Sequence, residues 1–168
     1  MSDNSLDKVD VLIIGAGFSG VYQLYRLREL GFKVHLLEAG AGLGGIWHFN
    51  CYPGARTDTH CQIYQFTRDD LWKDWNWSEL FPGWREMQRY FEYVDKKLDL
   101  SKDITFNTRV RSAEFDQDGN YWLVKADGDL EIKASFLDIN TGFGSKPYIP
   151  AFNGFCLLYT SPSPRDQR

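Results

Sequence analysis

The stretch Gly15-Ala16-Gly17-Phe18-Ser19-Gly20 follows an apolar run at Val9–Ile14 and begins a helical pattern that ends near Gly31. Glycine is needed at its first position for a tight strand-to-helix turn, at its third for close approach of a diphosphate, and at its sixth for close packing of the helix on the strand. Free N–H groups at the start of such a helix bind the diphosphate. The sequence therefore predicts a dinucleotide-binding βαβ unit, with the candidate cofactor-binding residues Gly15, Gly17, Phe18, Ser19 and Gly20.

The segments after this motif support the βαβ unit. Leucine and valine recur at helical spacing from Val21 to Leu30, and a second apolar run, Val34–Leu37, ends at Glu38. A carboxylate at this point accepts hydrogen bonds from the adenosine ribose and disfavours a ribose 2′-phosphate. Glu38 is therefore a further candidate, and the site is predicted to take FAD or NAD in preference to NADP.

The composition indicates a single core and an acidic surface. The 168 residues are 43% hydrophobic, with a net charge of -4 and a pI near 5.3. This is enough for one domain or part of one, preceded by a flexible N-terminus at residues 1–8. The charge argues against nucleic acid as a partner. Since no apolar stretch could span a bilayer and no signal peptide is evident, a cytoplasmic location is expected.

The cysteines and histidines indicate neither a metal site, nor a disulfide framework, nor a nucleophilic active site. The cysteines are odd in number and lack metal-ligand spacing, so we expect no metal site and reduced thiols at Cys51, Cys61 and Cys156. The histidines lack a nucleophile or metal-ligand partner at usable spacing, so structural roles are expected for His35, His48 and His60.

Tryptophans are concentrated in the middle of the chain. Trp47 follows the diglycine Gly44-Gly45 and is a candidate for contact with the cofactor. Most tryptophans fill cores or interdomain contacts. Packing roles are therefore expected for Trp72, Trp75, Trp77 and Trp84.

The rest of the chain has a mixed α/β pattern. An amphipathic helix is expected from Gly83 to Leu98. Turn residues separate short strands, the last three forming an antiparallel meander, at residues 104–106, 110–115, 121–126 and 130–133. A buried return strand is expected at Phe136–Ile139, followed by the small-residue turn Asn140–Gly142, where a backbone can approach a ligand. This order matches the first half of a two-dinucleotide flavoprotein.

Two blocks near the N-terminus resemble the flavoprotein monooxygenases, and within them the Baeyer–Villiger monooxygenases. The glycine motif with Glu38 is shared by very many FAD and NAD proteins. The segment Gly44–Trp47 is similar to the family sequence G-G-T-W, with Ile46 where a threonine is usual. That change keeps the β-branch and loses a hydroxyl.

Two further blocks resemble the same family. The segment Tyr52–Asp58 is similar to Y-P-G-A-R-x-D and is followed at the family's spacing by Tyr64. The related N- and S-oxygenases usually lack this block, so it is the most discriminating one. The segment Ile139–Gly142 is similar to the A-T-G linker before the NADPH domain, with Asn140 replacing alanine.

The resemblance implies an FAD-dependent enzyme that uses NADPH. Such an enzyme inserts one oxygen atom of O2 beside a ketone carbonyl, through a peroxyflavin, and forms an ester or lactone. The implied fold is α/β: a Rossmann-like FAD-binding βαβ domain with an inserted antiparallel β-meander. Residues 9–155 would form the N-terminal part of this FAD domain in an incomplete two-dinucleotide-binding flavoprotein. The NADPH site would lie in the missing part, and the partners would be a small ketone and O2.

The resemblance also implies roles for individual residues. Asp58 is expected near the reactive face of the isoalloxazine, paired with an arginine from the other cofactor domain as the catalytic residue. By its residue type alone, Asp58 could instead stabilise the Pro-Gly turn. Tyr64 could equally be a core ring. The other residues implied to contact or close over FAD are Gly45, Ile46, Trp47, Tyr64, Val110, Thr141 and Gly142.

Residues 156–168 depart from the family pattern. The fingerprint F-x-G-x-x-x-H-x-x-x-W-P is expected shortly after Phe155, but Cys156–Asp166 instead resembles a translated sequencing adapter. We therefore expect a disordered, non-native tail at 156–168 and exclude it from the fold. Without the fingerprint, the NADPH domain and the arginine partner of Asp58, the chain itself is expected to be inactive and to bind FAD weakly at best.

Three hypotheses follow for the function. The first is a fragment of a Baeyer–Villiger monooxygenase, which the Tyr52–Asp58 block favours. The second is a fragment of an N- or S-oxygenating flavin-containing monooxygenase, or of a flavin disulfide reductase. For a reductase, however, Cys51 and Cys61 are spaced too widely to be its C-x-x-x-x-C redox pair. The third is a stand-alone FAD- or NAD-binding module without catalysis.

Overall fold

The predicted βαβ unit forms at the start of the chain. The computed structural model describes residues 8–142, so the expectations for residues 1–7 and for the tail at 156–168 lie outside it. Strand β1 spans Lys8–Ile14, helix α1 Phe18–Glu29 and strand β2 Val34–Leu37. β1 therefore begins at Lys8, which the sequence had placed in the flexible N-terminus. β1 and β2 are parallel, and β2 together with Val11–Ile13 of β1 is buried, as parallel strands covered on both faces usually are.

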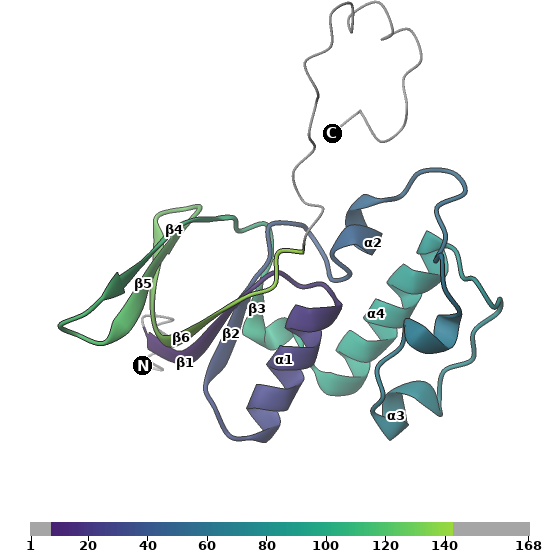
Figure 1. Ribbon diagram of the computed structural model, residues 1–168, viewed down its shortest axis with the longest axis horizontal. Helices are drawn as coiled ribbons and strands as arrows, with labels where there is room; N and C mark the ends of the chain where they lie inside the picture. The colour runs from purple at the N-terminus through teal and green to yellow at the C-terminus, as the bar shows by residue number, and fades with distance from the viewer. Residues whose placement is uncertain (1–7, 143–168) are drawn as a thin grey trace, which may run out of the picture.

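Two helices cover one face of these strands. Helix α1 ends where Gly31 adopts a positive φ of 86°, the expected glycine stop. Helix α4, Trp84–Leu98, confirms the predicted amphipathic helix and lies beside α1 (Figure 1). Its apolar side joins the core cluster that contains Val11 and Ile13 of β1. The buried residues of α4 in that cluster are Met87, Tyr90, Phe91 and Val94.

The segment between β2 and α4 contains short helices that the sequence did not predict. They are α2 at Ile46–Phe49, a 3-10 turn at Cys61–Ile63 and α3 at Asp69–Trp72. Three of the four tryptophans assigned to packing join the first core cluster at its edge, namely Trp75, Trp77 and Trp84. The packing role expected for Trp72 is wrong. Its ring is 40% exposed, and its Nε1 donates to the Asp69 carboxylate within α3.

The second half of the described chain forms the predicted meander. After a 3-10 turn at Ser101–Asp103 come the strands β3, Ile104–Thr105; β4, Val110–Asp116; β5, Tyr121–Ala126; and β6, Leu130–Ile139. β3 pairs parallel with β2, whereas β4, β5 and β6 pair antiparallel. In the described residues the sheet has the order β3-β2-β1-β6-β5-β4 (Figure 1). The predicted α/β fold with its inserted antiparallel meander is therefore confirmed.

Strand β6 corrects the prediction of two separate strands at its position. It is continuous because no glycine or proline interrupts it. Its first half, up to Ala134, pairs antiparallel with β5, and from Lys133 onward it pairs parallel with β1. One strand thus links the meander to the βαβ unit.

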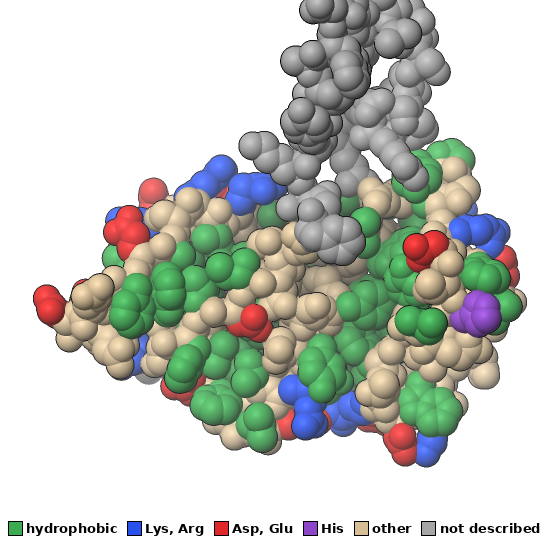
Figure 2. Space-filling view, in the orientation of Figure 1, with side chains coloured by type: hydrophobic (Ala, Val, Ile, Leu, Met, Phe, Trp, Pro, Cys, Tyr) green, Lys and Arg blue, Asp and Glu red, His purple; other side chains and the backbone are tan. Residues whose placement is uncertain are grey.

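The expectation that Phe136–Ile139 is buried is also wrong. Phe136 and Ile139 are 62% and 63% exposed. The helices α1 and α4 contact the β1 and β2 side of the sheet and leave this part of β6 uncovered (Figure 1). Hydrophobic side chains gather over the meander in Figure 2. Within the meander, the ring of Phe115 packs on that of Trp122 with centroids 5.3 Å apart.

Other side chains in the described range have structural partners. His35 is buried in β2, and its Nε2 lies 2.7 Å from Thr105 Oγ1, while burial lowers the pKa of the imidazole. Within residues 8–142, Cys51 and Cys61 are free thiols, and no group of three potential metal ligands occurs. Among these residues there is also no helix of the length and apolar character needed to cross a membrane.

Candidate functional site

The glycine turn follows β1, and later parts of the chain add strands on both sides of β1. The chain leaves the carboxyl end of β1 through Gly15, passes along α1 and adds β2 on one side of β1, whereas β6 returns on the other side (Figure 1). Ligands of open α/β sheets bind in the crevice at such a switch point, outside the carboxyl ends of the strands. The crevice between the ends of β1 and β6 is therefore the candidate dinucleotide site.

The three glycines of the motif have different surroundings. Gly15 adopts a φ of 100°, and a Cβ there would lie 2.6 Å from the Asn140 carbonyl oxygen. A Cβ on Gly20 would lie only 1.8 Å from the Gly15 carbonyl oxygen. A Cβ on Gly17 would meet nothing closer than Gly45 Cα, at 3.8 Å. Gly15 and Gly20 are thus required by the fold itself, while Gly17 leaves open space beside the turn.

The first turn of α1 presents unused N–H donors to that space. Gly17 is the N-cap residue, and the first bond within the helix runs from Val21 N to Gly17 O, at 3.0 Å. The N–H groups of Phe18, Ser19 and Gly20 therefore have no partner inside the helix. Within the described residues no side chain caps this end, and its first turn contains no acidic residue. The positive end of the helix dipole and this glycine cradle fit the diphosphate of a dinucleotide.

A second glycine segment lies against the first. Gly44 N donates to Ala16 O at 2.9 Å, and a Cβ on Gly45 would come within 2.9 Å of Gly17 Cα. The helix α2 starts directly after Gly45, with Ile46 exposed and the Trp47 ring 8% exposed in the core. Glycine at position 45 is therefore needed for the two backbones to approach this closely.

Glu38 connects the same two segments. Its side chain is buried, with Oε2 accepting from Ala16 N at 2.6 Å and Oε1 accepting from Gly40 N at 2.6 Å. Its backbone N–H donates to Thr105 O, and its carbonyl oxygen accepts from Thr108 N. The carboxylate therefore joins the glycine turn to the loop after β2, a role that the sequence did not indicate. Its contact with a ribose stays a prediction.

Asp58 and Tyr64 form a hydrogen-bonded pair. Tyr64 Oη donates to Asp58 Oδ1 at 3.0 Å. Burial, and secondarily the neighbouring carboxylate, raises the pKa of Tyr64. The Tyr64 ring also packs edge-on against Trp47 and Phe18, with centroids 5.6 and 6.1 Å apart. Tyr64 thus packs at the edge of the core, and its contact with the cofactor stays a prediction.

This pair shares one cavity with the start of α1. The cavity measures about 560 Å³ and is open on one side. It is lined by Phe18, Ser19, Tyr22, Gln23, Asp58, Thr59, Ile63, Tyr64 and Phe66. The structure therefore brings the glycine motif and the end of the Tyr52–Asp58 block together, although they are separate in sequence.

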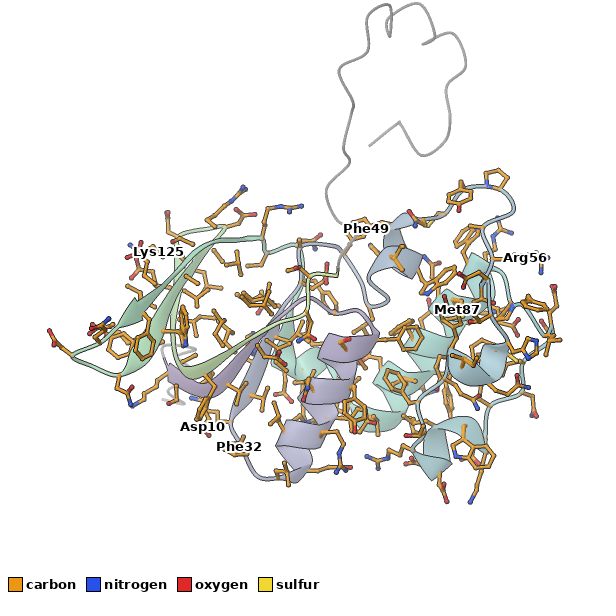
Figure 3. The ribbon with its side chains drawn as sticks, viewed as in Figure 1. Asp10, Phe32, Phe49, Arg56, Met87 and Lys125 are labelled. Carbon is orange, nitrogen blue, oxygen red and sulfur yellow. The ribbon has the colours of Figure 1, made fainter. Side chains whose placement is uncertain are left out.

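Other residues of the Tyr52–Asp58 block are structural. Arg56 pairs with Glu79 and donates to Phe81 O at 2.9 Å, and Figure 3 shows it at the outer side of the molecule, away from the sheet. Thr57 is 4% exposed, and its Oγ1 has no hydrogen-bond partner among the described residues. Asp58 is therefore the residue of this block that lines the cavity beside α1.

The remaining candidates lie farther along the chain. Val110 begins β4 opposite Ala126 and packs against a second core cluster, which includes Leu12 of β1 and Val124 of β5. Thr141 and Gly142 follow the end of β6 and are exposed. The residue before them, Asn140, was not among the candidates, yet its Nδ2 is buried and has no hydrogen-bond partner in the part of the chain that the structure describes. Its signal in the sequence was the replacement of a family alanine by an amide.

Comparison with known proteins gives one family model and many relatives. Residues 13–76 match the model of the NAD(P)-binding Rossmann-like domain. The chain is 59% identical, over 92% of its length, to cyclopentanone 1,2-monooxygenase of Comamonas sp. (strain NCIMB 9872). It is 45% identical, over 89% of its length, to acetone monooxygenase (methyl acetate-forming) of Gordonia sp. (strain TY-5). It spans 28% of the length of each of these relatives.

Solved structures agree with these relatives. The described fold superposes on OTEMO in complex with FAD and NADP with a TM-score of 0.80 and 35% sequence identity, covering 88% of this chain and 28% of that one. These likenesses confirm the family resemblance that the sequence motifs indicated. They leave the roles of the individual candidate residues as predictions.

Proposed function

We propose that this chain, whose sequence and fold match the FAD-binding part of the Baeyer–Villiger monooxygenases, holds FAD in an enzyme that inserts one oxygen atom of O2 beside a ketone carbonyl. The names of two relatives support this chemistry, since one acts on cyclopentanone and the other forms methyl acetate from acetone. Methyl acetate is acetone with an oxygen atom inserted beside its carbonyl carbon. Because the chain spans about 28% of these relatives, the complete activity belongs to a longer enzyme, and we expect the 168 residues alone to show none.

One observation carries the proposal. The cavity beside the first turn of α1 contains both Ser19, from the diphosphate-binding turn, and Asp58, from the block that distinguishes the ketone-oxygenating family. A general FAD- or NAD-binding module requires the glycine turn alone. The carboxylate held in the same cavity supports a reaction next to the bound dinucleotide.

The residues of the chain divide into those that hold FAD and those near its reactive end. The N–H groups of Phe18–Gly20 would bind the diphosphate, and Glu38 would meet the adenosine ribose. Trp47 and Tyr64 would flank the cofactor. The other expected contacts are Gly45, Ile46, Val110, Thr141 and Gly142. The chemistry that bound FAD supplies is the uptake of hydride from NADPH and the activation of O2.

Asp58 would act by its negative charge and its fixed orientation. Tyr64 holds one carboxylate oxygen through its hydroxyl, which donates to Asp58 Oδ1 at 3.0 Å. The carboxylate can then pair with the arginine that the family resemblance implies from the second cofactor domain. Such a pair would position the nicotinamide and stabilise negative charge beside the flavin.

A chimera tests this function. Residues 1–155 of this chain replace the matching segment of the Comamonas cyclopentanone monooxygenase, and cyclopentanone-dependent oxidation of NADPH is measured. We expect activity in the chimera and a loss of at least a hundredfold in its Asp58→Ala variant, with FAD retained. The matched control is Asp74→Ala, which removes an exposed carboxylate that pairs with Lys97 on the surface.

Two results would contradict the proposal. A chimera that binds FAD, oxidises an amine or sulfide and leaves ketones unchanged would favour the N- or S-oxygenating alternative. A chimera in which Asp58→Ala behaves like Asp74→Ala would assign Asp58 to the Pro-Gly turn alone.

The substrate would be a small ketone, and the cytoplasmic location expected from the sequence stays a prediction.

A further inference from the structure

We propose that the side-chain amide of Asn140 is an additional ligand of the dinucleotide and donates a hydrogen bond to its diphosphate. This inference rests on the proposed function only in requiring that the chain bind FAD. Asn140 stands where the resemblance places alanine, so the contact would be a property of this chain and not of the family pattern.

The first argument is position. Asn140 directly follows β6, and its backbone N–H donates to Ile14 O, the last residue of β1, at 2.8 Å. Its carbonyl oxygen lies so close to Gly15 that a Cβ on the glycine would be 2.6 Å away. Asn140 therefore borders the crevice between β1 and β6 on the side opposite β2, next to the turn that precedes the free N–H groups of α1.

The second argument is an unpaired donor. Asn140 Nδ2 is buried from solvent and makes no hydrogen bond to any residue that the structure describes. A buried amide without a partner destabilises the folded chain, and native structures contain few such groups. An acceptor supplied by a ligand would remove that penalty.

The third argument identifies the acceptor. The groups already found around the crevice are donors: the N–H groups of Phe18, Ser19 and Gly20 at the positive end of α1. Glu38, the nearby acceptor, already receives hydrogen bonds from Ala16 and Gly40. A set of converging donors fits an oxygen-rich anion, and the diphosphate is the anionic part of FAD.

The test compares Asn140→Ala and Asn140→Asp with the unchanged 168-residue chain. Binding of FAD, ADP and adenosine is titrated, and the thermal midpoint of each ligand-free protein is measured. We expect Asn140→Ala to weaken both FAD and ADP about tenfold, as removal of a charge-assisted hydrogen bond does, and to leave adenosine unchanged. Its ligand-free midpoint should be equal to or above that of the unchanged chain, because an unpaired donor has been removed.

Asn140→Asp retains the shape and replaces the donor by a negative charge. We expect it to weaken FAD and ADP more than Asn140→Ala does, which decides the matter even if the alanine variant folds poorly. Ser135→Ala is the control, an exposed polar residue on the same strand, and should bind all three ligands normally.

Specific results would overturn the inference. Unchanged affinity of both Asn140 variants for ADP, or an equal loss of adenosine binding, would exclude the contact with the diphosphate while leaving the proposed function intact. If the unchanged 168-residue chain bound neither FAD nor ADP, the same variants would be compared in the chimera described above. A chimera that bound no FAD would overturn both the inference and the proposed FAD-binding function.

Discussion

Glycines of one short motif differ in what they do for the molecule. Gly20 makes room for the Gly15 carbonyl oxygen inside the protein, whereas Gly17 makes room on the open side of the turn. The spacing of the motif predicted both needs, because they are properties of a strand-to-helix turn. The two glycines can therefore be separated by experiment, one by stability and the other by binding.

Alanine at position 20 should affect stability, whereas alanine at position 17 should affect FAD binding. Gly20→Ala would force a Cβ to within 1.8 Å of a backbone oxygen, so we expect a loss of several kcal/mol or failure to fold. Gly17→Ala should change the free energy of unfolding by less than about 1 kcal/mol and weaken FAD binding at least tenfold. Urea unfolding and FAD titration measure the two effects. Normal FAD binding by Gly17→Ala would show that the diphosphate does not approach this residue.

Glu38 should matter before any dinucleotide binds. In Glu38→Gln one acceptor oxygen becomes an amide donor, which faces a backbone N–H of Ala16 or Gly40. We expect the ligand-free chain to lose about 1–3 kcal/mol of stability, the usual cost of an unsatisfied buried group. Chemical unfolding in the absence of FAD checks this. Equal stability with weakened FAD binding would mean that the ribose contact is the whole role of this carboxylate.

The sequence could place Glu38 at the end of β2 but could not reveal its hydrogen bonds. Those bonds depend on how the loop after β2 folds back onto the glycine turn, and no spacing rule describes that loop. The same holds for Asn140, whose unpaired amide becomes visible only when β6 is placed beside β1. Residues with a role set by local turn geometry were predictable, and residues with a role set by tertiary contact were not.

At the scale of the element, helix α4 supports the start of α1 through Phe66. Tyr90 on its apolar face is fully buried, and its hydroxyl accepts from Phe66 N at 2.9 Å. Its ring lies tilted against that of Trp77, with centroids 4.9 Å apart. Phe66 in turn packs against Phe18 at the start of α1. The helix was predictable from its apolar periodicity, and its partners were not.

Burial makes Tyr90 a source of alkaline sensitivity. It raises the pKa of this phenol from 10.0 to about 12, so the folded state favours the neutral form. The resulting stability is complete below pH 10 and is lost as the pH rises to 12, by about 2–3 kcal/mol. Tyr90→Phe should therefore show a smaller fall in unfolding free energy over that range, measured by urea titration at each pH. Identical slopes for the two proteins would exclude Tyr90 as the cause.

Strand β6 shows where element prediction failed. The sequence suggested two strands, at residues 130–133 and at Phe136–Ile139, with Ala134 and Ser135 between them. The backbone continues through these residues as one strand, which pairs along one edge with β5 up to Ala134 and along the other edge with β1 from Lys133 onward. Periodicity reports which face of a strand is buried and is silent about which neighbour it pairs with.

At the scale of the whole molecule, apolar surface remains uncovered on the sheet. Phe136 and Ile139 are both more than 60% exposed, and hydrophobic side chains gather over the meander in Figure 2. Large exposed apolar patches mark contacts with other protein surfaces. The relatives, of which this chain spans about 28%, contain the additional protein that could cover such a surface.

We expect Phe136→Ser to reduce self-association of the isolated chain. Because the ring is 62% exposed, its loss should lower stability by less than about 1 kcal/mol. Self-association, followed by light scattering against protein concentration, should decrease. Val11→Ser on the neighbouring strand β1 is the contrasting variant, since Val11 is buried and its replacement should unfold the protein. Unchanged association in Phe136→Ser would indicate that another surface is responsible.

The pairing of β1 with β6 has a consequence for how the protein is made. Lys8 pairs with Lys133 and Ile14 with Ile139. One edge of the first strand therefore stays unpaired until some of the last described residues have been synthesised. During synthesis on the ribosome, β1, α1 and β2 can assemble early, while the other edge of β1 stays open until the meander has emerged. Such distant pairings slow folding and expose a strand edge in the interval. The crevice proposed to bind the dinucleotide is therefore complete only once residues 133–139 have emerged, and cofactor capture should follow the emergence of β6 from the ribosome.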